Sequence, residues 1–302
     1  MEHFFGIDIG GTSVKIGLVD STTGLIDKIK YSSTELQEGG KFISNFSRIL
    51  GEELAKHPEV KKAGIGIPGT ITKDGRSTLE IPNLDVLSHK SLVNILEKDH
   101  PGVQFILEND AHVAALGEYY FGAEKLPENY LFITLGTGVG GAAIIDRKVF
   151  KGGDGNPMEI GHILSRNGKE LEALIGKAGL MELINDILKK SKLGSKIGKK
   201  MEAWDTKLLV SAAEGNDKVA IKIFKKIGTL LGEALVSTIR LLDIKTIIVG
   251  GGLSASYNFV FKPMMKVMNK KLTPYYTKNI SVKKASLGNN AGIIGAASLW
   301  FK

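Results

Sequence analysis

The chain has 302 residues, 43% of them hydrophobic and 24% charged, which excludes a disordered protein and predicts a soluble protein of two domains. It contains no cysteine, which excludes disulfides and thiolate metal sites. It has no apolar run near the roughly 20 residues of a membrane span and no basic leader, so we expect a cytoplasmic protein without a membrane partner. The formal net charge of +8 reflects lysines clustered at 189–200 and after Asp243, and because these clusters lack interleaved aromatics and arginines, we expect a solvated surface and no nucleic-acid partner.

Short apolar runs and amphipathic stretches alternate along the first half of the chain. The runs at 4–9 and 14–20 predict two strands joined by the turn Gly10-Gly11-Thr12. The stretch 42–57 has apolar residues at helical spacing, and 103–110 alternates as a strand before a helix begins. Mixed strands and helices in this order predict an α/β fold. The other elements expected here are strands near 25–32 and at 61–69 and a helix at 111–122.

One pattern occurs twice. IDIGGTSVKIGLVD at 7–20 and ITLGTGVGGAAIID at 133–146 each contain a strand, a glycine turn, a second strand and a closing aspartate, Asp20 or Asp146. Two related hairpins predict a duplicated fold with a cleft between the copies. No low-complexity linker separates the halves, so we expect a helix near 110–125 to connect them. The later elements expected are helices at 168–190, 204–214, 216–242 and near 256–272, and a strand at 246–250.

The glycine turns are candidate anion sites. Backbone N–H groups approach an anion closely where no Cβ intervenes, as in Gly10-Gly11-Thr12 and Gly136-Thr137-Gly138. Tight hairpins alone would also use glycines, but a third run, Gly250-Gly251-Gly252, follows a buried strand. GTGVGG is followed by a strand rather than a helix, and no P-loop motif occurs, which excludes both of those nucleotide-binding classes. Asp8 precedes the first turn, where its carboxylate could hold Mg²⁺ directly or through water.

The chain contains the motifs DIGGT-x-x-K, E-N-D-A, LGTG-x-G, E-I-G-H and V-G-G-G, in this order. These motifs and their order resemble those of the ROK family of sugar kinases and sugar-responsive repressors. The resemblance implies a two-domain actin-like ATPase (ribonuclease H-like) fold with duplicated β-hairpin phosphate loops and with ATP and Mg²⁺ bound between the domains. The implied nucleotide-binding residues are Asp8, which also binds the metal, Gly10, Gly11, Thr12, Lys15, Gly136, Thr137, Gly138, Gly250, Gly251 and Gly252.

The same resemblance suggests where the two domains begin and end. We expect an N-terminal α/β domain at 1–115 and a larger C-terminal α/β domain at 116–287. The sequence NNAGIIGAASL, within a predicted helix at about 288–302, resembles the family's last helix, which returns to the N-terminal domain.

Asp110 is the candidate catalytic residue. Phosphoryl transfer to a hydroxyl needs a base that takes the hydroxyl proton. Asp110 follows a strand and opens a helix, so it could instead be an ordinary helix N-cap. Its place in E-N-D-A favours the catalytic role by resemblance, whereas His112 is expected on the helix surface.

The stretch PMEIGHILSRNGKELEAL, 157–174, places a histidine between two glutamates and could form a metal site, an acid/base pair or the polar wall of a pocket. Family members commonly have a cysteine zinc motif after E-x-G-H, but here that segment is SRNGKELEA. We therefore predict a sugar-binding wall without structural zinc, although His162 could instead cap buried backbone. By resemblance, the sugar-binding residues are Gly69, Asn83, Asn109, Asp110, Glu159, His162 and Glu172.

These features predict an ATP-dependent sugar kinase, a homodimer in carbohydrate metabolism that converts glucose to glucose 6-phosphate at the entry to glycolysis. N-acetylmannosamine, N-acetylglucosamine and fructose remain alternative acceptors, and polyphosphate remains an alternative donor. A sugar-responsive repressor is the alternative of another class. Repressors of the family carry an additional N-terminal helix-turn-helix module, whereas the first phosphate strand begins here at residue 4.

Overall fold

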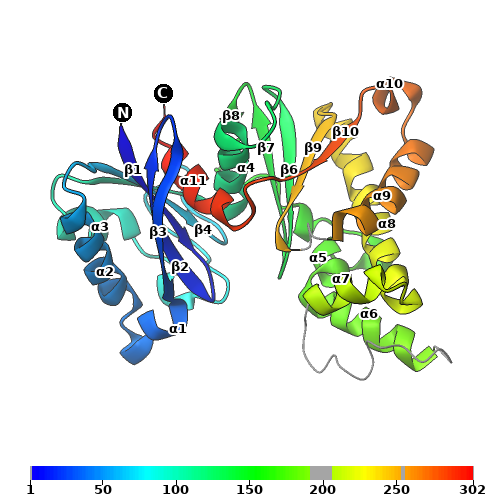
Figure 1. Ribbon diagram of the computed structural model, residues 1–302, viewed down its shortest axis with the longest axis horizontal. Helices are drawn as coiled ribbons and strands as arrows, with labels where there is room; N and C mark the ends of the chain where they lie inside the picture. The colour runs from blue at the N-terminus through cyan, green and yellow to red at the C-terminus, as the bar shows by residue number, and fades with distance from the viewer. Residues whose placement is uncertain (1, 191–205, 253–255, 302) are drawn as a thin grey trace. The chain divides into compact units, whose positions relative to one another are not determined.

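A computed structural model describes residues 2–190, 206–252 and 256–301 (Figure 1). The chain forms two compact units, each built from separate stretches of sequence. The first unit extends beyond the expected boundary at 115/116, which lies within the continuous helix α4 (Asp110–Phe121). The first unit comprises Met1–Glu128, Ala142–Pro157 and Ser286–Lys302, and the second comprises Asn129–Gly141 and Met158–Ala285.

The first unit contains a five-stranded sheet in the order β3-β2-β1-β4-β5. β1 pairs antiparallel with β2 and parallel with β4, so the predicted hairpin lies at the centre of the sheet. The strands are β1 (His3–Ile9), β2 (Ser13–Asp20), β3 (Gly24–Ser32), β4 (Lys62–Ile67) and β5 (Gln104–Asn109), all near their predicted positions. The helices are α1 (Ser33–Leu36), α2 (Phe42–Lys56), α3 (Leu92–Asp99), α4 and α11 (Ala291–Ser298), with short 3₁₀ turns η1 (Glu38–Gly40), η2 (Asp85–Leu87) and η6 (Gly288–Asn290).

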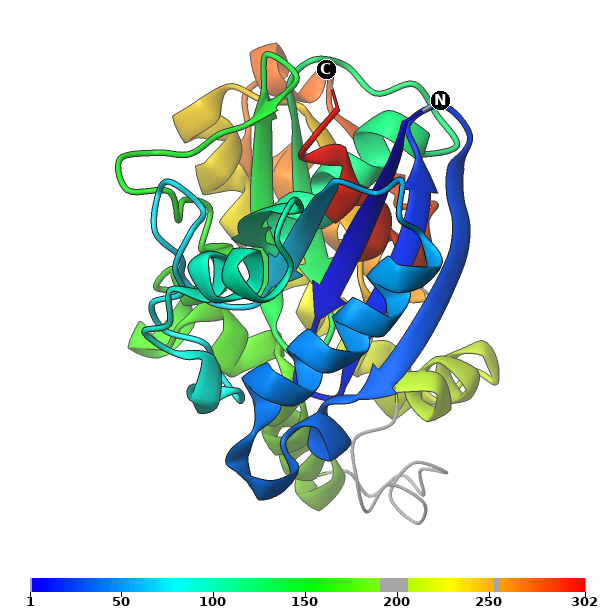
Figure 2. The same ribbon diagram turned by 90° about the vertical axis from the view of Figure 1, so that its left-hand side faces the viewer.

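The two faces of β1 bury different partners, as expected from the alternation of side chains along a strand. Phe5, Ile7 and Ile9 belong to the main core together with apolar side chains of α2 and α3. Phe4, on the opposite face, packs with Ile293 of α11. Figure 2 shows α2 crossing one face of this sheet. The face of β1 formed by its even-numbered residues, which also carries Asp8, is therefore the face on which α11 lies.

Glycines allow α11 to pack closely against this sheet. A Cβ on Gly6 of β1 would collide with the carbonyl oxygen of Ile293, and one on Gly64 of β4 would collide with that of Ala296. On α11 itself, a Cβ on Gly295 would collide with the backbone of Val113 in α4. Backbone packing at this distance leaves no room for any side chain, so all three positions require glycine.

The second sheet has the order β10-β9-β6-β7-β8. β9 pairs in parallel with both β6 and β10. The strands are β6 (Tyr130–Leu135), β7 (Val139–Ile145), β8 (Lys148–Val149), β9 (Thr246–Gly250) and β10 (Ser281–Lys284). The helices are α5 (Leu171–Ile175), α6 (Lys177–Lys190), α7 (Thr206–Glu214), α8 (Lys218–Leu242), α9 (Tyr257–Lys271) and α10 (Pro274–Thr277), with 3₁₀ turns η3 (Ile160–His162) and η4 (Arg166–Gly168).

One predicted helix of this region is wrong in its extent. The stretch 168–190 forms two helices, α5 and α6, instead of one. Gly176 stands between them with φ −73° and ψ 176°, an extended conformation that interrupts the helical hydrogen bonds. Apolar spacing continues through Gly176, so hydrophobic periodicity alone did not reveal the break.

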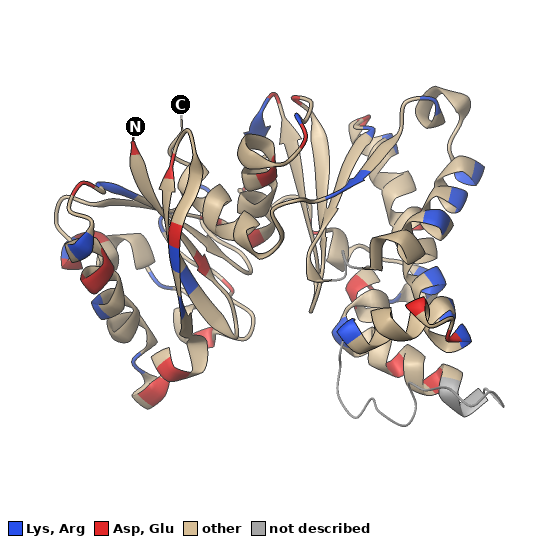
Figure 3. Ribbon diagram, in the orientation of Figure 1, with Lys and Arg blue, Asp and Glu red and all other residues tan. Residues whose placement is uncertain are grey.

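Lysines of the described C-terminal region lie mainly on α9 and β10 (Figure 3). The other predicted cluster, at 189–200, lies outside the residues whose side chains are described. Within the described ranges, none of the helices combines the length and the apolarity that crossing a membrane requires.

Candidate active site

The first glycine turn is held in place by the residue that opens α1. The N–H of Gly10 donates to Ser13 O at 3.0 Å and closes the turn between β1 and β2. The Ser33 hydroxyl donates to Gly10 O at 2.6 Å, and the Ser33 N–H donates to Thr12 O at 3.2 Å. Gly11 and Thr12 are exposed at the tip. The carbonyls of the turn thus have protein partners, while its tip is open to an anion.

Two charged side chains lie directly behind this turn. Asp8 of β1 and Lys15 of β2 face each other in the hairpin register, and Lys15 Nζ donates to Asp8 Oδ2 at 2.6 Å. Gly292 of α11 lies against them, since a Cβ there would be 3.0 Å from Asp8 Cγ. The pair combines a hard oxygen ligand and a cation at the base of the turn, the chemistry that phosphate and magnesium require.

The segment around Gly69 and Asn83 approaches the same turn. Gly69 has φ +84°, and a Cβ would collide with Glu80 O, so the position requires glycine for both conformation and space. Asn83 is also left-handed, with φ 64°. Its Cβ would lie 3.6 Å from a Cβ built on Gly11. Asn109 Nδ2 donates to Gly69 O at 3.2 Å, so two of the predicted sugar-binding residues of the first unit, Asn109 and Gly69, are bonded to each other.

Asp110 is the first residue of α4, and Asn109 is its N-cap. The side chain of Asn109 accepts from Ala111 N at 2.9 Å and from His112 N at 3.4 Å, with the extended dihedrals typical of a cap. Asp110 Oδ1 accepts from Ala111 N at 2.8 Å, and the residue is exposed. The capping role considered for Asp110 therefore belongs to Asn109, and Asp110 is an exposed residue at the start of the helix.

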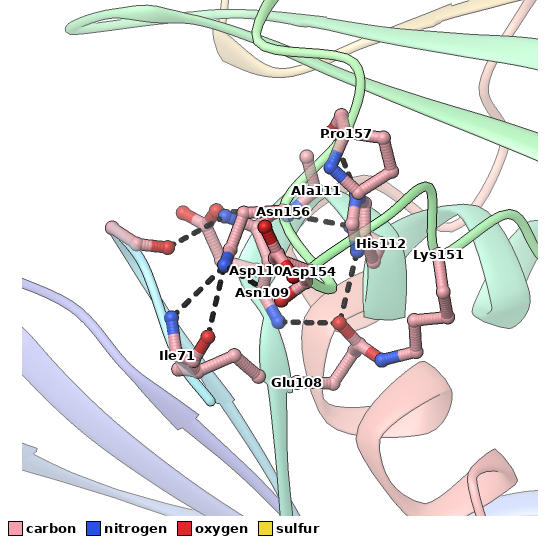
Figure 4. Close-up of polar contacts among 11 residues, drawn as sticks. Ile71, Glu108, Asn109, Asp110, Ala111, His112, Lys151, Asp154, Asn156 and Pro157 are labelled. Atoms are coloured by element: carbon pink, nitrogen blue, oxygen red, sulfur yellow. Dashed lines mark hydrogen bonds and ion pairs between the residues drawn. The ribbon is translucent and has the colours of Figure 1, made fainter. Parts of the chain in front are cut away.

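The expected surface position of His112 is wrong, because the residue is 1% exposed. Its Nδ1 lies 2.9 Å from Glu108 Oε1, and its Nε2 lies 3.3 Å from Pro157 O. Glu108, 2% exposed, also pairs with Lys151 Nζ and accepts from Asn109 N at 3.0 Å (Figure 4). Burial alone would raise the pKa of Glu108, but the hydrogen bonds and positive charge of His112 and Lys151 outweigh it and hold that pKa below its usual value.

A second set of contacts fixes the segment that carries Lys151 and Pro157. Asn156 Oδ1 accepts from Ile71 N at 2.9 Å, and Asn156 Nδ2 donates to Ile71 O at 2.9 Å, as between paired strands. Lys73 Nζ donates to Gly153 O at 2.8 Å. All of these residues belong to the first unit, and Met158 begins the next stretch of the second unit.

In the second unit, the turn Gly136-Thr137-Gly138 is supported by α5 and α6. Gly136 N donates to Gly138 O at 2.9 Å, and Lys177 N, at the start of α6, donates to Thr137 O at 2.9 Å. Glu172 Oε2 accepts from Val139 N at 2.7 Å. A Cβ on Gly138 would collide with this carboxylate. Glu172, predicted as a sugar ligand, thus supports the second glycine turn.

The third glycine run lies beside the second turn. A Cβ on Gly136 would be 3.9 Å from Gly252 N, and one on Gly251 would collide with Leu135 O at the end of β6. A Cβ on Gly250 would lie 2.8 Å from the Phe132 ring. The third glycine run, predicted to bind the nucleotide, and the second glycine turn are therefore neighbours within one unit.

The predicted sugar wall is open to solvent. His162 closes η3, and its ring Nδ1 lies 2.9 Å from Glu170 Oε2, while its Nε2 lies 4.0 Å from Glu159 Oε2. The hydrogen bond to Glu170 raises the pKa of His162 above its usual value, although burial opposes this, and nearby Glu159 and Glu172 add to it. The ring pairs with carboxylates, which argues against the alternative of a cap on buried backbone. Glu170, which sequence reasoning missed, is its nearest carboxylate.

The described residues contain no group of three or more His, Cys, Asp and Glu side chains arranged to hold a metal by themselves. A magnesium ion that arrives with a nucleotide does not need such a group, because it uses one or two carboxylates together with phosphate oxygens and water. Asp8 supplies one carboxylate at the base of the first turn.

The family model described as the ROK family matches residues 4–302. The chain belongs to the ROK family. It is 30% identical to a glucokinase of Thermotoga maritima over 97% of this chain and 96% of that protein, and 28% identical to an N-acetylmannosamine kinase of Escherichia coli over 97% and 96%. The predicted membership is confirmed.

Two solved structures agree with this fold. A protein from Cytophaga hutchinsonii described as a candidate sugar kinase is 34% identical, with a TM-score of 0.91 over 99% of this chain and 100% of that chain. A ROK glucokinase from Streptomyces griseus, solved with glucose and AMPPNP, is 29% identical, with a TM-score of 0.80 over 98% of each chain. The predicted actin-like ATPase fold is confirmed, and the names of these relatives agree with the predicted class of sugar kinase.

Proposed function

We propose that this ROK-family sugar kinase transfers the γ-phosphoryl group of ATP to the 6-hydroxyl of glucose. The observation that carries the proposal is the placement of Asp110. Its exposed carboxylate stands at the start of α4, next to Asn109, whose side chain reaches Gly69 in the segment that approaches the first glycine turn. An exposed carboxylate, in the unit that also offers an anion site, is what the reaction requires.

The phosphates would be bound by backbone and by charge. In the first unit, the tip at Gly11 and Thr12 offers N–H groups, and Lys15 offers a cation. Asp8 would hold Mg²⁺, directly or through water, and this ion supplies charge neutralisation at the phosphates when bound. The second unit offers its own turn, Gly136-Thr137-Gly138. The remaining glycine run, Gly250 to Gly252, would approach the adenosine.

The proposed reaction has one proton to move. The 6-hydroxyl oxygen of the sugar forms a bond to the γ-phosphorus while the bond from that phosphorus to the bridging oxygen of ATP breaks. The hydroxyl proton passes to the Asp110 carboxylate, and the bridging oxygen leaves with ADP. Asn109 contributes by capping α4, which keeps Asp110 at the start of the helix.

The acceptor is assigned to glucose from sequence similarity together with the polar residues available. Hydroxyl groups are recognised by carboxylates and amides that form paired hydrogen bonds, such as Glu159 and Asn83, and the ring of His162 offers a further donor or acceptor. Glucokinases are among the relatives that share about 30% of residues over nearly the full chain. An N-acetylated sugar is the main competitor, supported by the similarity to an N-acetylmannosamine kinase.

A matrix of donors and acceptors tests this proposal. Purified protein is assayed with ATP or polyphosphate against glucose, N-acetylmannosamine, N-acetylglucosamine and fructose, with Mg²⁺ present. We expect the highest kcat/KM for ATP with glucose and a product that glucose-6-phosphate dehydrogenase oxidises. A higher value for an acetylated sugar would replace the acceptor, a higher value for polyphosphate would replace the donor, and no transfer to any sugar would contradict the kinase function.

A further inference from the structure

A buried charge network lies directly behind the proposed base. Glu108, the residue before the N-cap of α4, is 2% exposed and bonds to His112 Nδ1 at 2.9 Å, to Lys151 Nζ and to the Asn109 N–H. His112 is equally buried and reaches Pro157 O with its other ring nitrogen, 3.3 Å away. Figure 4 shows the three side chains converging between β5, α4 and the segment 151–157.

A buried carboxylate is costly unless several donors satisfy it. Glu108 has three donors, and they come from three places: its own backbone neighbour, the first turn of α4, and Lys151. Removing any one donor leaves this buried carboxylate with fewer hydrogen bonds to compensate its charge. The network therefore favours one arrangement of these elements over alternatives.

Asn109 connects this network to the start of α4 and to Gly69. Its N–H is bound by Glu108, its side-chain oxygen caps α4, and its side-chain nitrogen donates to Gly69 O. The backbone N–H and the side chain of Asn109 are therefore both held by hydrogen bonds, and Asp110 is the next residue. On the other side, Lys151 and Pro157 bring the segment before Glu159 into the same network.

We propose that Glu108, together with His112 and Lys151, is a positioning residue that orients Asp110 for proton transfer by fixing the peptide of Asn109 and the segment 151–157. This role rests on the proposed kinase function. Glu108 does not touch the substrate. Its effect reaches the reaction through Asn109 and Asp110, and a small displacement of a catalytic group is enough to lower turnover about a hundredfold.

The test compares Glu108→Gln with Glu53→Gln as a matched control. Glu53 of α2 lies in the same unit, is 8% exposed, and accepts from Tyr31 Oη at 3.0 Å and Lys56 Nζ at 2.8 Å. Both changes remove a buried charge that is paired with one lysine and one ring-bearing side chain. We expect Glu108→Gln to lower kcat roughly tenfold or more with little change in the KM for ATP, and Glu53→Gln to keep kcat within about twofold.

Lys151→Met provides a second variant if Glu108→Gln does not fold, because Lys151 lies at the partly exposed edge of the network. We expect Lys151→Met to lower kcat as well, but by less than Glu108→Gln does. A kcat within about twofold of wild type in either folded variant, or an equal loss in Glu53→Gln, would overturn the positioning role.

Hydrogen exchange gives a readout that does not depend on activity. In Glu108→Gln or Lys151→Met, the amides of Asn109, Ala111 and His112 and of the segment 151–157 should exchange faster, while those of α2 stay unchanged. Unchanged protection at these amides would also overturn the proposal. If wild type phosphorylates no sugar, the proposed function fails, and the exchange result alone decides whether the network fixes this region.

Discussion

The start of α4 and the segment from Glu159 to His162 were predicted to bind the same sugar, yet they are built differently. At α4, the candidate base follows an N-cap that is bound to a buried carboxylate and to Gly69. In the second unit, the side chains of Glu159 and His162 are 43% and 57% exposed, and their contacts are with each other and with Glu170. One region is ordered before any ligand arrives, and the other is held by surface ion pairs.

This difference predicts that the two regions contribute to different steps, one to turnover and the other to sugar binding. Buried, fully paired networks restrain geometry, whereas exposed ion pairs contribute about 0–1 kcal/mol and adjust easily. Changes near α4 should therefore act on turnover, and changes near His162 should act on affinity for the sugar. The following experiments, from the largest expected effect to the smallest, would sharpen or break this distinction.

The largest effect is expected for Asp110→Asn. The amide cannot take the hydroxyl proton, so kcat should fall at least about a hundredfold, the lower end for loss of a general base. Asn109 is the cap of α4, so the helix should remain intact and the melting temperature should change little. Steady-state kinetics and thermal melting measure both. Near-normal turnover in the folded variant would remove Asp110 from the mechanism.

A moderate effect on affinity is expected for His162→Ala and Glu159→Gln. Loss of one hydrogen bond to a sugar hydroxyl is worth about 0.5–1.5 kcal/mol, so KM for the sugar should rise roughly two- to tenfold with kcat nearly unchanged. Glu182→Gln is the control, because Glu182 forms an exposed pair with Lys169 Nζ at 3.3 Å in the same unit. A large loss of kcat in His162→Ala would contradict the distinction.

A smaller effect concerns pH. The hydrogen bond that the His162 ring donates to Glu170 raises the pKa of His162 in the folded protein above its unfolded value near 6.5. The stabilisation from this pair is therefore fully present below that unfolded value and is lost as pH rises through the folded pKa. NMR titration should show a lower midpoint for His162 in Glu170→Gln than in wild type. Identical midpoints would show that the pair does not form.

No effect is expected from removal of zinc. Structural zinc usually has four Cys or His ligands, and this chain has no cysteine. The purified protein should contain no stoichiometric zinc, and its activity should persist in a zinc-selective chelator when Mg²⁺ is present. One zinc per chain by elemental analysis, lost together with activity on chelation, would contradict a metal-free wall at His162.

Local patterns in the sequence predicted the strands of the first sheet and both glycine turns well, but not β8 or β10 of the second sheet. Apolar alternation and glycine punctuation depend on neighbouring residues, so β1, β2 and their turn lie where the pattern placed them. The burial of His112 has another origin. It depends on Pro157, which is far away in sequence, and on Glu108 across the junction of a strand and a helix.

The available signal for this network was weak. Glu108 and His112 are four residues apart, a spacing that suggests a pair within one helix, but Glu108 ends a strand. Similarly, Glu170 was overlooked beside the better-placed Glu159 and Glu172, because the isolated bridge between Leu164 and Glu170 cannot be read from the sequence. Contacts made by tertiary folding were the part that sequence patterns did not contain.

The glycine-lined seat of α11 has a consequence for synthesis. α11 covers the face of the first sheet that carries Phe4 and Val19, but it follows the whole second unit along the chain. At about 5–20 residues per second, the ribosome needs on the order of ten seconds or more to make what lies between. Throughout that time the part of this face that α11 covers, around Phe4 and Val19, stays exposed in the nascent first sheet. The second unit can therefore form its own core before α11, the final helix of the first unit, has been synthesised. The first unit begins earlier along the chain but is completed later.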